Sequence, residues 1–558
     1  MLIGLALLTL AVSSPPPGPD LLLENATVYA TADAKPGRLS IVARDGKIVF
    51  VGDADGARRF APSGRRIDLS GAFVFPGWAD AHGHLLGLGK SLEVARLRGS
   101  ADSSDAARRI ADLARKIPGA RWIEGQGWDQ NLWPGKSFPD AHALDAVVDD
   151  RPVVARRVDG HALWVNSRAL ALAGIGKDTA DPSGGRILRR ADGTPSGVLV
   201  DNAMDLLDRV VPTATPEDFA RRIRAAAREC VAVGLTQVQD ASGYSPEDVA
   251  LLEQLAARHE LPLRVYATVS PEVAALEVFF RKGVHVGGGA DFLTVRAIKA
   301  YADGALGSRG AALLADYSDE PGQRGLLVTP PQRLDEVARQ AREKGWQIWI
   351  HAIGDRGNRV ALDAFRKAAA SSPGQAARDA RPRVEHAQVI APEDLPRFGR
   401  EGVIASMQPT HATSDMPWAE ARLGPERVRG AYAWRSLKNG GARLAGGSDF
   451  PVESENPLLG FYAAITRQDL HGQPAGGWRS SEKLTRREAL ALFTSDAAWA
   501  AFEEGSRGKI APGFAADLTV FRADPMTAPE RDIPGIATVM TIVNGRIVQP
   551  PGSAEPGP

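Results

Sequence analysis

The stretch WQIWIHAIGD, residues 346–355, sets the pattern from which the fold is predicted. Its apolar run is typical of a strand buried on both faces, and it ends in polar residues and a glycine. Helical segments alternate with seven stretches of the same form, which are FVFPGWADAH (73–82), LTQVQDA (235–241), LPLRVYATVS (261–270), LTVRAIKAYAD (293–303), RVEHAQVI (383–390), GVIASMQPT (402–410) and ARLAGGSDF (442–450). Eight parallel strands with helical returns close into a barrel. We therefore predict an α/β protein with a (β/α)₈ TIM barrel.

The two ends of the chain predict a second, smaller domain. Residues 20–75 and 506–550 both contain short β-branched runs separated by turns, and Asp45-Gly46 is typical of a two-residue hairpin. We expect these two segments to form one composite β-sandwich domain. The barrel would then comprise residues 76–98 and 212–505.

A long segment separates the first two candidate strands of the barrel. Residues 99–211 are rich in Trp, Gly and Asp and are much longer than an ordinary helical return. Insertions that follow a barrel strand lie at the catalytic face. We therefore predict an α+β insertion after barrel strand 1 that covers the active site.

The N-terminus predicts export. Leu2–Val12 is an apolar run of signal-peptide length, too short to span a bilayer stably, and the Pro-rich residues after it would end a helix. Residues 1–19 are therefore interpreted as a signal peptide and linker of a periplasmic or secreted protein. The segment lacks an early Lys or Arg, so a misassigned start, and with it a cytoplasmic protein, or a membrane-adsorbed tail are the alternatives.

The composition of the chain excludes several classes of binding partner and of metal site. Lys plus Arg and Asp plus Glu both number 67, so no net charge attracts nucleic acid or an acidic membrane surface. The single cysteine, Cys230, excludes intramolecular disulfides and cysteine-rich metal sites. We expect a small-molecule substrate, no stable membrane span, and a homodimer as the default oligomer.

Four histidines and one carboxylate follow predicted strands. His82 and His84 end the first strand two residues apart, so their side chains share a face. His351, His386 and Asp449 end the fifth, sixth and eighth strands. Because these ends form one rim of a barrel, the residues are predicted to bind a divalent metal.

Lys299, in the fourth strand, leaves two interpretations open. Burial lowers the pKa of a lysine, and a neutral amine can add CO₂ to form a carbamate that bridges two metals. Alternatively, Lys299 is an ordinary lysine paired with Asp303 or Asp449.

Several motifs resemble the amidohydrolase superfamily, and within it the amidohydrolase-3, YtcJ-like branch. The resemblance extends from about Leu21 to Val548 and rests on PGWADAHGHL, RVDGHALWVNSRAL, KAYADGALGSRGA, HAIGD, EHAQ, GGSDFPVESENPL and GKIAPGFAADLTVF. The motifs occur in the order and spacing of that branch. They specify the family and leave the substrate open.

The resemblance implies a role for each candidate residue. His82 and His84 would bind the more buried metal, His351 and His386 the more exposed one, and a carbamate on Lys299 would bridge them. Asp449 would contact the attacking water and transfer its proton. One or two divalent ions, zinc above all, are implied.

The predicted activity is hydrolysis of a C–N bond, in an amide, N-acyl or N-formyl group of a small molecule, by metal-activated hydroxide. A cyclic amide, an imine or an ester is the alternative substrate, and a non-catalytic binding protein is the alternative class. Weaker candidates for substrate contacts are His161, Trp128, Asp303, Arg309 and His411.

Overall fold

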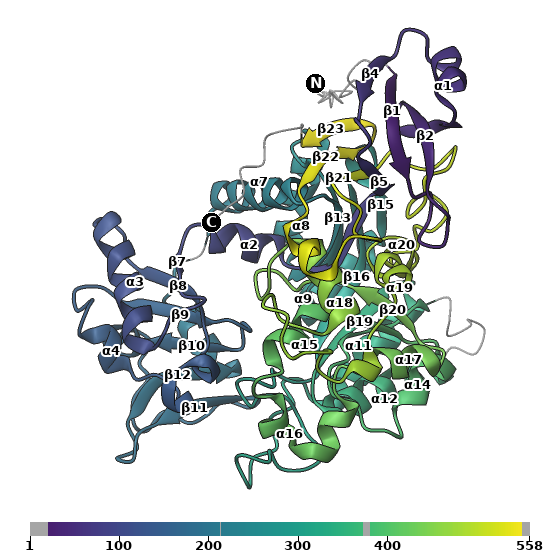
Figure 1. Cartoon of the computed structure of the whole chain (residues 1–558). Helices are drawn as coiled ribbons and strands as arrows, with labels where there is room; N and C mark the ends of the chain where they lie inside the picture. Colours follow the sequence, from purple (N-terminus) through teal and green to yellow (C-terminus); the bar gives the residue numbers. More distant parts are fainter. Residues whose placement is uncertain (1–19, 213, 372–379, 550–558) are drawn as a thin grey trace, which may run out of the picture.

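The computed structural model describes residues 20–212, 214–371 and 380–549. The predicted signal peptide and linker, residues 1–19, lie outside this range. The described residues form a barrel, a sheet built from both chain ends, and an inserted unit beside the barrel (Figure 1). Among them, no helix has the length and apolar character needed to cross a membrane.

The barrel is built from eight parallel strands. In spatial order they are β6 (Trp78–Gly83), β13 (Leu235–Tyr244), β14 (Arg264–Val269), β16 (Leu293–Tyr301), β17 (Gln347–Ala352), β18 (Arg383–His386), β19 (Ile404–Met407) and β20 (Arg443–Gly446). Beyond β20, the backbone N–H of Asp449 donates to the carbonyl of His82 at 2.7 Å, which joins the last strand to the first. The predicted TIM barrel is confirmed.

Helices return the chain between the strands. The main ones are α7 (Pro216–Ala232), α8 (Pro246–Ala257), α9 (Val273–Lys282), α11 (Pro331–Glu343), α12 (Asp355–Ser371), α14 (Leu395–Glu401), α17 (Trp434–Asn439), α19 (Arg486–Leu492) and α20 (Ser495–Ala500). α7 and α8 begin with capping boxes in which Thr215 and Ser245 exchange hydrogen bonds with Asp218 and Asp248. Cys230 lies on the face of α7 that is buried in the core.

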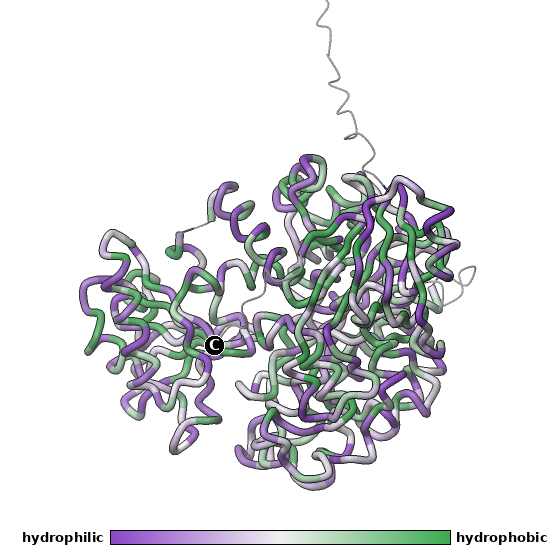
Figure 2. Tube along the Cα trace, turned by 45° about the horizontal axis from the view of Figure 1, so that its top comes forward, coloured by the Kyte–Doolittle hydropathy of each residue, from purple (hydrophilic) through white to green (hydrophobic). Residues whose placement is uncertain are grey.

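Strands from both chain ends share one sheet. Its order is β23 (Arg546–Gln549), β22 (Thr538–Val543), β21 (Leu518–Phe521), β5 (Phe73–Pro76), β1 (Leu21–Val28), β2 (Gly37–Arg44) and β3 (Lys47–Gly52), with β4 (Arg65–Asp68) also paired to β1. Asp45 and Gly46 have φ values of 48° and 76° and form the predicted hairpin between β2 and β3. In Figure 2, hydrophobic residues run along the strands of this sheet, and many peripheral loops are hydrophilic.

One predicted strand is corrected. FVFPGWADAH is two strands, because β5 pairs with β21 in the terminal sheet and only β6 belongs to the barrel. The break lies at Gly77, whose N–H donates to the Asp517 carbonyl at 2.8 Å. The chain therefore passes from the terminal sheet into the barrel at Gly77.

The insertion follows β6 and the short helix α2 (Leu85–Ser91). Its sheet has the order β11 (Gly185–Arg189), β12 (Pro195–Asp201), β10 (Ala162–Val165), β9 (Val153–Arg157), β8 (Ile123–Trp128) and β7 (Ala95–Arg96), and α3 (Ser103–Lys116) packs on it. Trp128, Trp133 and Trp164 pack together in its core. The insertion therefore has a hydrophobic core of its own beside the barrel (Figure 1).

Candidate metal centre and active site

The predicted ligands converge at the carboxyl ends of the barrel strands. His82 lies at the end of β6 and His84 directly after it, whereas His351 and His386 lie at the ends of β17 and β18. Asp449 follows β20 and joins them through the backbone bond to His82. His386 and Asp449 have φ values of 74° and 62°, which are uncommon for non-glycine residues and frequent at functional sites.

Asp449 is the carboxylate shared by two groups of potential ligands. Its Oδ1 lies 3.0 Å from Nε2 of His84 and 3.4 Å from Nε2 of His82. Its Oδ2 lies 3.7 Å from Nε2 of His411, which forms the second group with His386. In each group of three, the ligand atoms lie within 4.8 Å of one another. This spacing suits a cation placed between them.

Several imidazole nitrogens at the centre are buried and unsatisfied. Within the described parts of the chain, the Nε2 atoms of His82, His351 and His411 have no hydrogen-bond partner. An unpartnered buried polar atom is costly, and a bound cation would satisfy it. Burial also lowers the pKa of His351, His386 and His411, which favours the neutral imidazole that binds metals.

A second layer of polar groups orients these ligands. The carboxylate of Glu385 is hydrogen-bonded to Nδ1 of His82, and Gln408 Oε1 lies 2.8 Å from Nδ1 of His386. Asp80 accepts a hydrogen bond from the backbone N–H of His82 at 2.9 Å. Such contacts set the tautomer and ring orientation of a metal-binding histidine.

Lys299 lies at the floor of the site. Its side chain is buried, and burial lowers its pKa to about 8, although the charges of Glu385 and Asp449 oppose this shift. Its Nζ lies 5.0 Å from the ring centre of Tyr301. No ion pair of Lys299 occurs among the described residues at salt-bridge distance, so pairing with Asp303 or Asp449 is not what the structure shows.

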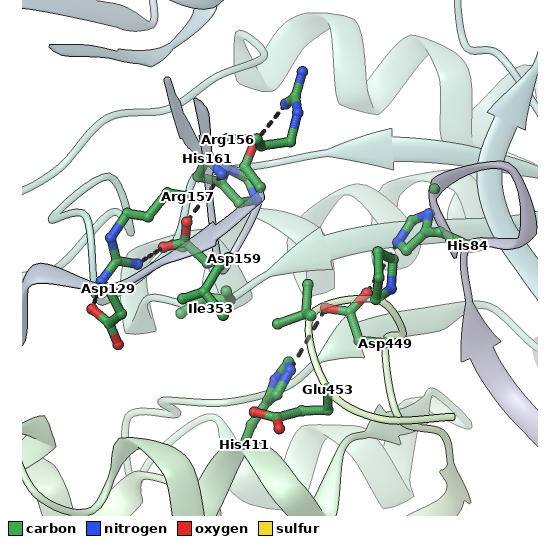
Figure 3. Close-up of a pocket in the computed structure, with 18 of the residues that line it drawn as sticks. His84, Asp129, Arg156, Arg157, Asp159, His161, Ile353, His411, Asp449 and Glu453 are labelled. Carbon is green, nitrogen blue, oxygen red and sulfur yellow. Dashed lines mark hydrogen bonds and ion pairs between the residues drawn. The ribbon is translucent and has the colours of Figure 1, made fainter. Parts of the chain in front are cut away.

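A cavity of about 630 Å³ extends from these residues to the insertion. In Figure 3, Asp449 lies between His84 and His411, whereas His161 and Asp159 lie across the cavity. Lys299, His351 and His386 also line it. The insertion therefore forms one wall of the cavity.

His161 comes from that wall. Its Nδ1 lies 2.7 Å from Oδ1 of Asp201, and its ring centre lies 5.0 Å from that of His351. Burial opposes a charge on His161, but the hydrogen bond and charge of Asp201 raise its pKa overall. The structure thus brings His161 and His411, two of the weaker candidates, to the cavity.

Three weaker candidates are not among the residues that line the cavity. Trp128 is fully buried and donates from Nε1 to the Ala155 carbonyl at 2.8 Å, so it belongs to the core of the insertion. Asp303 accepts three backbone N–H bonds and shapes the loops around the site. Arg309 is paired with Asp319 and Glu320 at 3.1 and 2.9 Å. The structure therefore favours, for these three side chains, a role in supporting the fold around the site and not contact with a substrate.

The sequence analysis did not single out several other charged residues at this site. Glu385 precedes His386 in a buried strand, and a charge at such a position is a usable signal. Arg157, Asp129 and Asp159 form a buried ion-pair cluster in the cavity wall. These three residues come together only through the fold of the insertion. The sequence pattern does not predict how the strands of the insertion pair.

Comparison with known proteins identifies the family of this chain. The profile of the Amidohydrolase family matches residues 65–549. The chain belongs to this family. It is 36% identical to the putative amidohydrolase YtcJ of Bacillus subtilis over 88% of this chain and 91% of that protein. It is 26% identical to an N-substituted formamide deformylase of Arthrobacter pascens over 94% of this chain and 97% of that protein.

A solved structure shares most of this architecture. An uncharacterized metal-dependent hydrolase from Pyrococcus horikoshii matches with a TM-score of 0.74 and 28% identity, over 92% of this chain and 99% of that one. This chain is thus an amidohydrolase-family protein with the fold of a metal-dependent hydrolase.

Proposed function

We propose that this amidohydrolase cleaves an amide, N-acyl or N-formyl C–N bond of a small molecule with the help of one or two divalent ions, zinc above all. The observation that supports the proposal most strongly is the convergence of unpartnered imidazole nitrogens and Asp449 at the floor of the cavity. If these histidines only packed the barrel, so many of their buried nitrogen atoms would not be left without partners.

The donor set fits divalent metal ions. His82, His84 and Asp449 would hold one ion. A second ion would lie at His386, which shares a group with Asp449 and has its ring centre 4.5 Å from that of His351. His411 is an additional nitrogen ligand within reach of the second position. Lys299 is buried with a lowered pKa, which favours the neutral amine that could add CO₂ and supply a carbamate as a further ligand.

A bound divalent ion would lower the pKa of a water molecule and polarise the substrate carbonyl. Asp449 faces both groups of histidines, so its carboxylate can accept the proton of the attacking water. It can then deliver that proton to the departing nitrogen, which would otherwise leave as an unstable anion. Neutral His351 and His386 stay available as ligands throughout.

The cavity suits an amide with an apolar substituent on nitrogen. Its volume of about 630 Å³ falls in the range of small-molecule sites. Apolar residues from five parts of the chain line it, namely Leu86, Leu132, Leu306, Trp418 and Val452. The formamide deformylase of Arthrobacter pascens acts, by its name, on N-substituted formamides. We propose this substrate class for the chain as well.

The test combines metal analysis with a substrate panel. Metal content per chain is measured on protein purified without added metal, and intact mass is measured in parallel to detect a carbamate. Hydrolysis of N-formyl and N-acetyl derivatives of para-nitroaniline is followed by the colour of the released amine. Chelation should abolish hydrolysis, and zinc should restore it. A protein that binds no metal, or that cleaves an ester, a cyclic amide or an imine but no open-chain amide, would contradict the proposal.

A further inference from the structure

His161 and Asp201 are brought together by the backbone of the insertion. β10 and β12 pair antiparallel with Ala162 opposite Val200, so the next residues along the ladder face each other. The backbone N–H of Asp201 donates to the His161 carbonyl at 3.0 Å, and the side chains meet at 2.7 Å. The pair is therefore fixed by main chain and side chain together.

The carboxylate of Asp201 is seated against the barrel. A Cβ atom on Gly304 would lie 2.4 Å from its Oδ1, and one on Gly310 would lie 2.2 Å from its Oδ2. Both glycines belong to the loop that follows β16, the strand of Lys299. Any larger residue there would displace the carboxylate, so this loop is shaped to receive a side chain of the insertion.

The backbone of Asp201 is strained. Its φ and ψ are 49° and −127°, a conformation that a non-glycine residue rarely adopts. Its Oδ2 is buried and has no hydrogen-bond partner within the described ranges. Strain and an unsatisfied oxygen are both costly, and such costs concentrate at functional sites. Packing alone does not explain a carboxylate at this position.

A second contact fixes the segment that carries His161. Asp159 accepts the backbone N–H of His161 at 3.1 Å and forms an ion pair with Arg157. The guanidinium of Arg157 lies where a Cβ on Gly307 would approach it within 2.9 Å. The loop after β16 thus receives the insertion at three glycines, Gly304, Gly307 and Gly310.

From this geometry we propose that the insertion supplies a catalytic residue, His161, and that Asp201 is its positioning residue. Asp201 accepts the Nδ1–H of His161 and fixes the ring in the cavity wall. The other ring nitrogen, Nε2, then accepts a hydrogen bond from the N–H of the amide group that is cleaved, on the side of the cavity opposite Asp449. The proposal rests on the hydrolysis of amides proposed above and adds a residue to that same site.

The fixed ring is suited to this role. Its centre lies 5.0 Å from that of His351, so the N–H of a substrate amide held at the candidate metal ligands would lie beside it. Because Asp201 and the strand pairing hold the ring, little reorganisation accompanies the hydrogen bond to the substrate. The insertion is then part of the active site and not a detachable cover.

The first experiment compares His161→Ala and Asp201→Ala with wild type on the substrates cleaved best in the panel. We expect His161→Ala to lower kcat about 100-fold or more, with a smaller change in KM. Added imidazole should restore part of the lost rate, because the deletion leaves room for it in the cavity wall. Asp201→Ala should lower kcat less and should not respond to imidazole.

His142→Ala is the matched control, because His142 lies in the same insertion, is exposed, and pairs with an aspartate, Asp140, at 3.0 Å. It should leave kcat unchanged. Metal content and melting temperature are measured for every variant, so that loss of metal or of folding is recognised. A His161→Ala enzyme with wild-type kcat, or one whose loss is confined to KM and resists imidazole, would overturn the catalytic role.

A second measurement does not depend on activity. A His Nδ1–H bonded to a buried carboxylate should give a downfield proton resonance in the wild type, which disappears in His161→Ala and in Asp201→Ala. Persistence of every downfield signal in both variants would overturn the paired arrangement. A wild type that cleaves no amide would overturn the proposed function, and the catalytic role with it, whereas this resonance would still decide the pairing.

Discussion

Glu385 is hydrogen-bonded through Oε2 to Nδ1 of His82, and both side chains are fully buried. This bond directs the other nitrogen of the ring, Nε2, toward Asp449 at 3.4 Å. Arg383 donates to both oxygens of Glu385, at 2.8 and 3.1 Å, and holds the carboxylate in place. The orientation of His82, in the first barrel strand, is therefore set by a residue of the sixth barrel strand, 303 positions later in the chain.

Replacing that carboxylate should weaken metal binding. Glu385→Gln keeps the shape of the side chain but loses the charge that orients His82, and we expect metal affinity to fall about 10- to 100-fold. Competition with a chelator, followed by metal analysis of the folded protein, measures the change. Glu277→Gln, at an exposed position of α9, is the control and should bind metal as the wild type does. Equal affinity in both variants would contradict the assignment.

Asp449→Asn tests the proton transfer. The amide keeps the size of the side chain but can no longer accept and release the proton, so we expect kcat to fall by about 10²- to 10⁴-fold. The four histidines are unchanged, so most of the metal should remain bound. Steady-state kinetics and metal content on the same sample separate the two effects. Near-normal kcat with bound metal would exclude Asp449 as the proton carrier.

The convergence of the candidate ligands could be predicted from the geometry of the barrel. Residues that end parallel strands share one rim, so His82, His351, His386 and Asp449 come together without knowledge of any loop. The strand pattern was therefore sufficient to predict that these side chains meet, and their binding of metal stays a prediction.

The walls of the site could not be predicted in this way. His161 and Asp201 meet only through the register of β10 with β12, and a third strand, β11, separates those two in the chain. Composition also did not show whether Trp128 faces the cavity or packs against Trp164, as it does in the structure. Contacts that depend on register or on loop placement need the three-dimensional structure.

A buried ion pair should hold the terminal sheet to the barrel. Arg264, in β14, pairs with Asp517 through two hydrogen bonds of 2.7 and 3.0 Å, and both side chains are nearly inaccessible. Arg264→Met would leave the carboxylate with the more distant Arg507 at 3.6 Å. We expect a loss of about 3–5 kcal/mol in the free energy of unfolding, seen as a lower melting temperature.

The comparison for that prediction is an ion pair at the surface. Arg44 and Asp20 also form two hydrogen bonds, but the Arg44 side chain is 43% exposed. Arg44→Met should therefore lower the melting temperature much less than Arg264→Met does. Equal shifts in melting temperature for the two variants would show that burial does not set the strength of these pairs.

Glu488 should contribute stability that depends on pH. Hydrogen bonds from Arg435 and from the capping box of α19 lower its pKa from 4.5 to about 2. Because folding lowers this pKa, the ionised carboxylate stabilises the folded chain above about pH 4.5, and that stabilisation is lost as the pH falls toward 2. The melting temperature of Glu488→Gln should lie below that of wild type at neutral pH, and the gap should close across this window. Thermal melts at a series of pH values measure the gap, with Glu277→Gln as the control, and a gap of constant size would show that the titration of Glu488 is not its source.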